Sequence, residues 1–145
     1  MHKKEINLAL IAAREGSKGV KNKNLLNIKN KPITKIAVDI ATKLKKIDNV
    51  ILSSDCEKLI KLKRKKKLNQ NSTPMMPVMQ DAIKNFEKFF KYKYQVKNLV
   101  IIDPTSPLRN SSDINKAIAL FKKKKPDLLV SVHEAQHNPY FSIVE

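Results

Sequence analysis

The sequence predicts an α/β fold in which a mostly parallel sheet lies between two layers of helices. Short apolar runs alternate with segments of helical spacing along the chain, the pattern of repeated strand–helix–strand units. The run 99–102 has no polar interruption, which is typical of a strand covered on both faces. The length of 145 residues suits one domain. We therefore expect a single three-layer domain over residues 1–145.

The first strand is expected over residues 6–11. Together with the basic residues before it, the apolar stretch that reaches Ala13 imitates a short signal peptide. Asn7 interrupts that stretch, which is near the lower length limit and runs directly into a polar motif. These features favour a strand over a leader peptide.

A helix, a strand and a second helix are expected next. Pro32 suits a first helical position, and apolar residues recur at helical spacing from there to about Lys46. Residues 49–53 form a short apolar strand, and residues 54–55 offer a cap for a helix that extends through Leu62. This strand–helix–strand order predicts a parallel pair.

Prolines divide the second half of the chain. Residues 69–77 are predicted to form a loop because they contain Ser72-Thr73-Pro74 and a second proline. The helix that follows carries a core face of regularly spaced apolar side chains: Val78, Met79, Ala82, Ile83, Phe86, Phe89 and Phe90.

The last expected elements follow the strand at 99–102. Two prolines within 103–109 force the chain out of the sheet. A helix capped by Ser111 or Ser112 should end at Pro126. The remaining segments are predicted as a strand at 128–132, a loop at 133–139 and the start of a further element at 140–144.

The charge balance alone does not identify a partner. Lys and Arg number 30 against 13 Asp and Glu, and the net charge of +17 attracts any polyanion. We interpret the lysine runs at 63–67 and 122–125 as solvated faces. The aromatic content is 6% without Trp, which gives few stacking platforms for single-stranded nucleic acid. Nucleic acid is therefore not expected as a partner.

The compartment follows from cysteine use and hydropathy. Cys56 is the single cysteine of the sequence, which excludes an internal disulfide and suits a reducing compartment. No run approaches the roughly 18 apolar residues of a membrane span. We expect a cytoplasmic protein that has no membrane partner.

The stretch 11–24 carries the most specific signal. Both glycines of the chain, Gly16 and Gly19, lie in it, and glycine lets a backbone adopt positive φ or approach a ligand closely. A turn after a strand also collects four cations, as a polyphosphate requires: Arg14, Lys18, Lys21 and Lys23. The spacing matches neither the three-glycine dinucleotide fingerprint nor the Walker loop.

This stretch resembles the N-terminal signature of the acylneuraminate cytidylyltransferases, A-R-x-G-S-K-G-x-x-x-K-N. It reads Ala13-Arg14-Glu15-Gly16-Ser17-Lys18-Gly19 and then Lys23-Asn24. Residues 50–55 resemble the family's V-x-V-S-[ST]-D, and residues 103–109 resemble its Q-P-T-S-P-L-R. Residues 130–132 and 137–140 resemble its later V-S-V and H-x-P segments. The four motifs occur in family order and cover nearly the whole chain.

The resemblance implies a Rossmann-like nucleotidyltransferase domain of the nucleotide-diphospho-sugar transferase type. Its reaction joins an acidic nine-carbon sugar to CTP and gives a CMP-sugar and pyrophosphate for cell-surface glycan synthesis. The partners would be CTP and the sugar, with Mg²⁺ as cofactor, in a homodimer of the full-length protein. The alternative is a non-catalytic remnant of this fold that binds a nucleotide or nucleic acid.

The matched motifs give each site residue a role by resemblance. Arg14 and Lys23 are expected to be catalytic because they neutralise the triphosphate. The expected nucleotide-binding residues are Ala13, Gly16, Ser17, Lys18, Gly19 and Asn24. The expected substrate-binding residues are Asp103, Thr105, Ser106, Arg109 and His137. For Arg109, a cap on the next helix or a pair with Asp113 remains open.

Three departures from the family pattern qualify these roles. Asp103 replaces a Gln, and its carboxylate either repels an acidic sugar, holds Mg²⁺ or caps its loop. The segment 67–77 retains only Asn71-Ser72-Thr73 of a longer family pattern. The chain stops at Glu145, before the family's dimerisation arm and late metal-binding carboxylates. We therefore expect a chain that lacks the C-terminal part and turns over little substrate.

Overall fold

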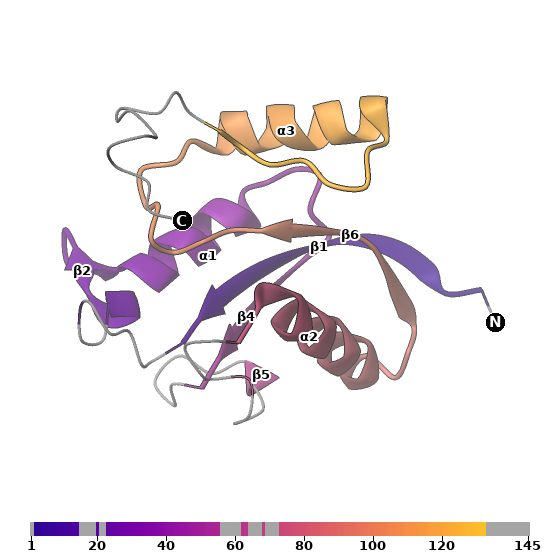
Figure 1. The fold of residues 1–145 in the computed structure, drawn as a ribbon, viewed down its shortest axis with the longest axis horizontal. Coiled ribbons are helices and arrows are strands. Elements are labelled where there is room, and N and C mark those ends of the chain that lie inside the picture. Colours follow the sequence, from indigo (N-terminus) through magenta and orange to yellow (C-terminus); the bar gives the residue numbers. More distant parts are fainter. Residues whose placement is uncertain are drawn as a thin grey trace, which may run out of the picture.

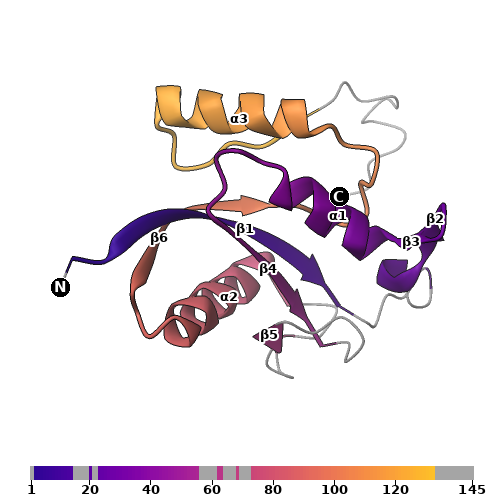
Figure 2. The same cartoon turned by 180° about the vertical axis from the view of Figure 1, so that it is seen from behind.

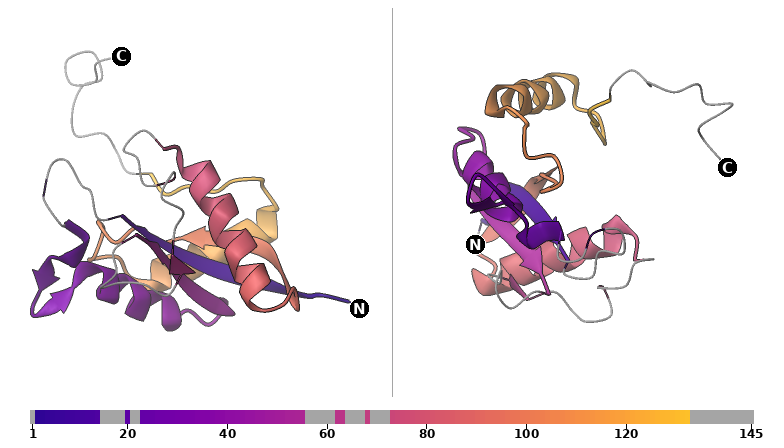
Figure 3. Two further views of the ribbon diagram at one scale, coloured as in Figure 1. Left: turned by 90° about the horizontal axis from the view of Figure 1, so that it is seen from below. Right: turned by 90° about the vertical axis from the view of Figure 1, so that its left-hand side faces the viewer.

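The computed structural model describes residues 2–14, 20, 23–55, 62–63, 68 and 73–132, and these form three layers (Figure 1). The middle layer is a parallel sheet whose strands are ordered β5-β4-β1-β6. The strands are β1 (Lys4–Ala13), β4 (Asn49–Ser54), β5 (Leu62–Lys63) and β6 (Tyr94–Ile101). The helices are α1 (Ile33–Thr42), α2 (Met75–Phe89) and α3 (Ser111–Lys124). α2 covers one face while α1 and α3 lie over the other (Figure 3), so the predicted three-layer fold is confirmed.

The central strand β1 is buried on both faces. Ala9, Ile11 and Ala13 pack in a cluster with Ala37 and Ala41 of α1. The small side chains on both elements let the helix lie close to the strand. The intervening leucines of β1, Leu8 and Leu10, belong to the cluster beneath α2. This alternation explains why the sequence of β1 is almost continuously apolar.

The layer beneath the sheet is centred on Phe86 of α2. Its ring centroid lies 4.8 Å from that of Phe90 and 6.3 Å from that of Tyr94. The Phe90 and Tyr94 rings also meet edge to face at 5.2 Å. These tilted arrangements are the favourable ones for aromatic pairs. They link the end of α2 to the start of β6.

A hairpin lies between the first loop and α1, at the same end of the molecule as the tip of β1 (Figure 2). It consists of β2 (Asn27–Ile28) and β3 (Lys31–Pro32), after the short 3-10 helix η1 (Lys23–Leu25). Its two turn residues have positive φ, 47° at Lys29 and 62° at Asn30, as a tight type I′ hairpin turn requires. The Ile33 amide donates to the Leu26 carbonyl at 2.9 Å, which joins the hairpin's base to α1.

Two of the predicted boundaries are wrong around the second and third helices. Leu62 belongs to β5 and not to a helix, while residues 56–61 lie outside the described part of the chain. α2 begins at Met75, so the last three residues of the predicted loop 69–77 are helical. Pro77 is compatible with this start because amides in a first helical turn have no helical acceptor.

The second half shows three further differences. β6 begins at Tyr94, five residues before the predicted strand at 99–102. The cap of α3 is Asn110, not Ser111 or Ser112, and its side chain accepts a hydrogen bond from the Ser112 amide at 3.0 Å. Residues 128–132 are not a strand, because no neighbour pairs with them in the described sheet. The segments predicted at 133–139 and 140–144 lie outside the described residues.

The aromatic cluster gives a stability prediction. Phe86 is 1% exposed, so Phe86→Ala leaves a cavity and should lower the free energy of unfolding by about 3–5 kcal/mol. Phe89 was expected on the core face of the same helix, but that prediction is wrong because its side chain is 71% exposed. Phe89→Ala should therefore cost less than about 1 kcal/mol. Urea unfolding followed by circular dichroism measures both values. Equal losses in the two variants would contradict the packing described for α2.

Candidate functional site

The ends of three neighbouring strands meet at one edge of the sheet. Ala13, the last residue of β1, pairs with Ser54, the last residue of β4. On the other side of β1, the Ile102 amide donates to the Leu10 carbonyl at 2.9 Å, so Asp103 leaves the sheet there. Arg14 therefore emerges between Asp55 and Asp103, as predicted from the motif positions. Carboxyl ends of parallel strands are where ligands bind in open α/β sheets.

A hydrogen-bond chain ties Arg14 to the far end of the first loop. The Asn24 side-chain amide donates to the Arg14 carbonyl at 2.7 Å. The Thr34 hydroxyl donates to the Asn24 carbonyl at 3.1 Å. Asn24 is 7% exposed and Thr34 is 1% exposed, so the bond between them is buried, while the bond to Arg14 is partly buried. Residues on the two sides of the loop are thus fixed relative to each other.

Lys23 is placed by the turn that contains Asn24. Its amide donates to the Val20 carbonyl at 3.2 Å, and its own carbonyl accepts from the Leu26 amide at 3.1 Å. Lys23 is only partly exposed, whereas Val20 is exposed. The structure thus places the backbones of Lys23 and Arg14 next to the same residue, Asn24.

The loop that follows β6 is closed by its own side chains. Asp103 Oδ1 accepts from the Thr105 amide at 2.9 Å and from the Thr105 hydroxyl at 2.8 Å. Arg109 Nε donates to the Ser106 carbonyl at 3.0 Å, and Arg109 Nη2 donates to the Asp103 carbonyl at 2.8 Å. Pro104 is buried, while Asp103, Thr105 and Ser106 are exposed. The loop is therefore anchored at one residue and presents polar groups to solvent.

Arg109 has a different role from the two local ones considered from the sequence. Its described bonds go to carbonyls of its own loop, while Asn110 caps α3 and Asp113 pairs with Lys116 at 3.7 Å. Partial burial lowers the pKa of the Arg109 guanidinium, and the negative charge of Asp103 opposes that shift. An arginine remains protonated at neutral pH all the same. The loop therefore contains a fixed cation.

Several predicted residues lie outside the described part of the chain: Gly16, Ser17, Lys18, Gly19 and His137. The structure brings four of the other predicted residues together at the end of β1: Ala13, Arg14, Lys23 and Asn24. The remaining four lie in the 103–109 loop: Asp103, Thr105, Ser106 and Arg109. Sequence reasoning missed Thr34. Its only signal is a hydroxyl residue near the start of a helix, which has many ordinary explanations.

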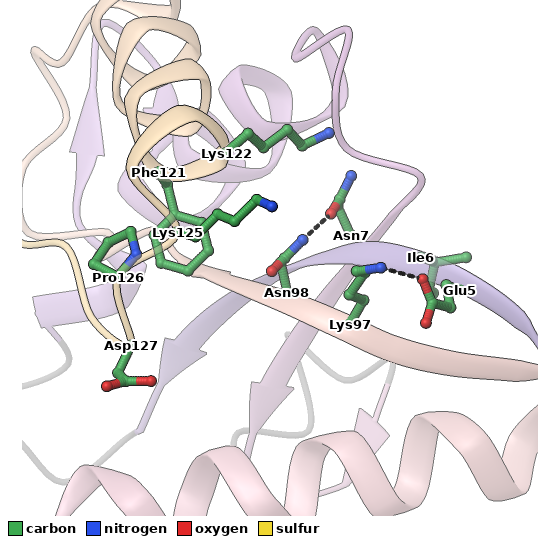
Figure 4. Close-up of a pocket in the computed structure, with 10 residues that line it drawn as sticks. All are labelled: Glu5, Ile6, Asn7, Lys97, Asn98, Phe121, Lys122, Lys125, Pro126 and Asp127. Carbon is green, nitrogen blue, oxygen red and sulfur yellow. Dashed lines mark hydrogen bonds and ion pairs between the residues drawn. The ribbon is translucent and has the colours of Figure 1, made fainter.

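A cleft of about 790 Å³ lies elsewhere, between the start of β1, the middle of β6 and the end of α3 (Figure 4). Asn98 Nδ2 donates to Asn7 Oδ1 at 2.7 Å on its floor, and Lys122 and Lys125 extend toward this pair. Lys97 forms an ion pair with Glu5 at its rim. None of the predicted site residues lines this cleft. We therefore locate the candidate site from the strand ends and not from the hollow.

The acidic groups that the structure describes at the strand ends do not by themselves make a metal centre. Within the described ranges, no three His, Cys, Asp or Glu side chains are grouped closely enough to hold a metal ion. Asp55 and Asp103 follow strands on opposite sides of β1. One or two carboxylates together with substrate phosphates are a usual ligand set for Mg²⁺. These residues thus fit a magnesium ion that arrives with a nucleotide.

Over the parts of the chain that the structure describes, no helix has the length and apolar character needed to cross a membrane.

The basic end of α3 is exposed from Lys122 to Lys125. Cations in a last helical turn interact favourably with the helix dipole. This agrees with the interpretation of that lysine run as a solvated face.

A family model described as "Cytidylyltransferase" matches residues 8–142. The chain is 34% identical over 148 residues to the "Post-translational flagellin modification protein B" of Campylobacter coli. It is 33% identical over 148 residues to the "CMP-N,N'-diacetyllegionaminic acid synthase" of Campylobacter jejuni. Each alignment covers 95% of this chain and 62% of the relative, so the chain spans less than two thirds of their length.

Two further likenesses are more distant. The chain is 29% identical over 130 residues to the "N-acylneuraminate cytidylyltransferase" of Escherichia coli, which covers 86% of this chain and 30% of that protein. A solved structure of CMP:2-keto-3-deoxy-manno-octonic acid synthetase complexed with CTP has a TM-score of 0.51 and 14% identity. It covers 83% of this chain and 48% of that one, and it supports the fold.

The closure of the 103–109 loop can be tested with a charge-conserving change. Arg109→Lys keeps the cation but loses the planar fork that reaches two carbonyls. Amide hydrogen exchange in residues 103–109 should speed up by about fivefold for one lost bond and about thirtyfold for two, since each bond is worth about 1 kcal/mol. Lys116→Arg, an exposed change on α3, is the control and should leave these amides unaffected. Unchanged exchange in Arg109→Lys would show that the loop does not depend on the guanidinium.

Proposed function

The chain belongs to the cytidylyltransferase family, and from that premise we propose that it provides the CTP-binding part of an enzyme that activates an acidic nine-carbon sugar. In this reaction the anomeric oxygen of the sugar attacks the α-phosphate of CTP and pyrophosphate leaves. The relatives named for legionaminic acid and N-acylneuraminate support this substrate class. Pseudaminic acid cytidylyltransferase of Campylobacter jejuni, 27% identical over 142 residues, supports it too.

The observation that carries the proposal is the position of Arg14 at the end of the central strand, tied to the turn that holds Lys23. Negative charge accumulates on the α-phosphate and on the leaving pyrophosphate as the reaction proceeds. Cations held in place beside those oxygens stabilise the transition state without having to reorganise. We assign this role to Arg14 and Lys23.

The rest of the nucleotide site is proposed from the matched motif. Ala13 leads into the loop, Gly16 and Gly19 let its backbone approach the phosphates, and Ser17 and Lys18 shape it around them. Asn24 lies at the far end of the loop and binds the Arg14 carbonyl there. The described bond between Asn24 and Arg14 supports a loop that begins and ends at one place.

The 103–109 loop is proposed as the sugar side of the site. Its exposed Thr105 and Ser106 offer hydroxyl groups, and Arg109 supplies a positive charge that suits an acidic sugar. His137 is proposed to join this side. The loop follows β6, directly beside the strand end that carries Arg14, so the two substrates would meet over β1.

Mg²⁺ is proposed as the cofactor, with Asp103 as its protein ligand. Both described bonds of the Asp103 carboxylate go to Oδ1, and the residue is exposed. When bound, the ion supplies positive charge that neutralises the triphosphate. Repelling an acidic sugar would bring the protein no gain, whereas a carboxylate near a triphosphate has a divalent partner.

A cytoplasmic location and a homodimeric state are also part of the proposal. A single cysteine in the sequence suits the reducing cytoplasm. A homodimer of the full-length protein is proposed from the family resemblance. A second candidate function, binding of a polyanion without turnover, is favoured only by the net charge of +17.

Calorimetric titration with CTP and Mg²⁺ tests the nucleotide site. Arg14→Ala and Lys23→Ala should each weaken CTP binding by about tenfold or more, because each removes a charged partner of the phosphates. Lys45→Ala is the matched control, since it also removes one positive charge but lies before β4, at the opposite edge. It should bind CTP like the unmodified chain.

Equal affinity in all four proteins would rule out the Arg14–Lys23 site. The polyanion alternative predicts a different pattern. A random single-stranded oligonucleotide would then bind more tightly than CTP, and its affinity would fall steeply with salt.

Asp103→Gln separates the roles open to this carboxylate. We expect it to weaken CTP binding in Mg²⁺ but not in EDTA, and to leave binding of an acidic nine-carbon sugar unchanged. Asp113→Asn, an exposed carboxylate change on α3, is the control and should alter neither. Tighter sugar binding with unchanged Mg²⁺ dependence would instead indicate charge repulsion by Asp103. No change in either ligand would leave Asp103 as a loop cap through Thr105.

A further inference from the structure

We propose that Asn24 and Thr34 form a clamp that positions Arg14, so that Asn24 affects nucleotide binding through Arg14 and not by touching the nucleotide. This inference rests on the proposed function, because it takes the site at the end of β1 as given. Asn24 and Thr34 are then positioning residues for a cation that binds phosphate. The clamp is defined by two hydrogen bonds, Asn24 to Arg14 and Thr34 to Asn24.

The Asn24 side-chain amide forms its described bond inside the protein. Its Nδ2 donates to the Arg14 carbonyl at 2.7 Å, a short bond for this type. The residue is 7% exposed, so its side chain is turned into the protein and not toward solvent. The Asn24 amide therefore stabilises the backbone at the end of β1.

The bond from Asn24 holds Arg14 at the point where the chain leaves the sheet. The ladder between β1 and β4 ends at Ala13, so Arg14 is the first residue past the paired strand. The bond from Asn24 fixes the Arg14 peptide plane and thereby the direction in which the side chain leaves the backbone. Small errors in the position of a catalytic group are costly, since orientation is a large part of catalysis.

Asn24 is itself held by Thr34. Thr34 is 1% exposed, and its hydroxyl donates to the Asn24 carbonyl at 3.1 Å. Thr34 lies in the first turn of α1, the helix that packs through Ala37 and Ala41 against β1. The chain of contacts is therefore closed: β1 carries Arg14, Asn24 holds Arg14, Thr34 holds Asn24, and α1 packs back on β1.

The chemistry of the clamp suits a cationic site. Each described bond joins an uncharged donor to a carbonyl, so the clamp adds no charge beside the phosphates and does not titrate. An Asp at position 24 would lack the donor and would place a carboxylate against the Arg14 carbonyl. Thr34 can be replaced by Ser without loss of the hydroxyl, whereas Val has the same shape and no donor. These substitutions separate hydrogen bonding from packing.

The experiment is a double-mutant cycle read by CTP titration in Mg²⁺. Thr34→Val and Asn24→Ala should each weaken CTP binding about fivefold, because each variant loses one of the two hydrogen bonds of the clamp. Thr34→Ser should bind CTP like the unmodified chain. In an Arg14→Ala background, Thr34→Val and Asn24→Ala should each change the affinity less than about twofold, because the group that they position is gone.

The possible results distinguish this clamp from the site itself. If Asn24→Ala keeps its full effect without the Arg14 side chain, Asn24 contacts the nucleotide directly and the clamp is refuted. If Thr34→Val lowers the melting temperature but leaves CTP affinity unchanged, Thr34 is merely structural and the clamp is again refuted. If Arg14→Ala alone binds CTP normally, the proposed nucleotide site fails. If Thr34→Val does not fold, the cycle with Asn24→Ala and the Thr34→Ser control still decides.

Discussion

The double burial of β1 is the constraint on which the rest of the structure depends. A strand with helices on both faces must be apolar along its length and cannot carry charged side chains in its middle. Its polar chemistry is thus restricted to its ends, where Arg14 emerges on one side and Glu5 pairs with Lys97 on the other. The alanines on the α1 face set how closely that helix approaches. That spacing in turn brings Thr34 within reach of Asn24.

The layers of the fold could be predicted because they follow from local periodicity. The spacing of apolar residues predicted β1, α1 and α2, and the alternation of strands and helices predicted the parallel sheet. The errors occur where local signals are ambiguous. Pro77 signals a loop but is also tolerated in a first helical turn, and a Ser pair beside Asn110 offers three adjacent caps. The hairpin turn at Lys29 and Asn30 gives only a weak signal without glycine.

The candidate site, like the fold, could be predicted only where local sequence carries the signal. The motif resemblance identified Arg14, Lys23 and the 103–109 loop as site residues. The predicted order of strands and helices implied that they lie at one edge of the sheet, where the structure has Arg14 and the loop. The contacts that organise the site could not be read in this way. The bond from Asn24 to Arg14 depends on how the chain returns after the loop, and the two carbonyls bound by Arg109 depend on the fold of its turn. Sequence identifies which groups are present, while tertiary packing decides what each group holds.

The run after α3 has a consequence for the behaviour of the protein in solution. Leu128, Val130 and Val132 are exposed, and the outer edge of β6 has no partner strand among the described residues. An open edge beside an apolar, β-prone run is a template for pairing between chains. The net charge of +17 opposes such contact by repulsion over a Debye length of about 8–10 Å at moderate salt. Electrostatic repulsion therefore opposes contact between these edges, and this repulsion weakens as the salt concentration rises.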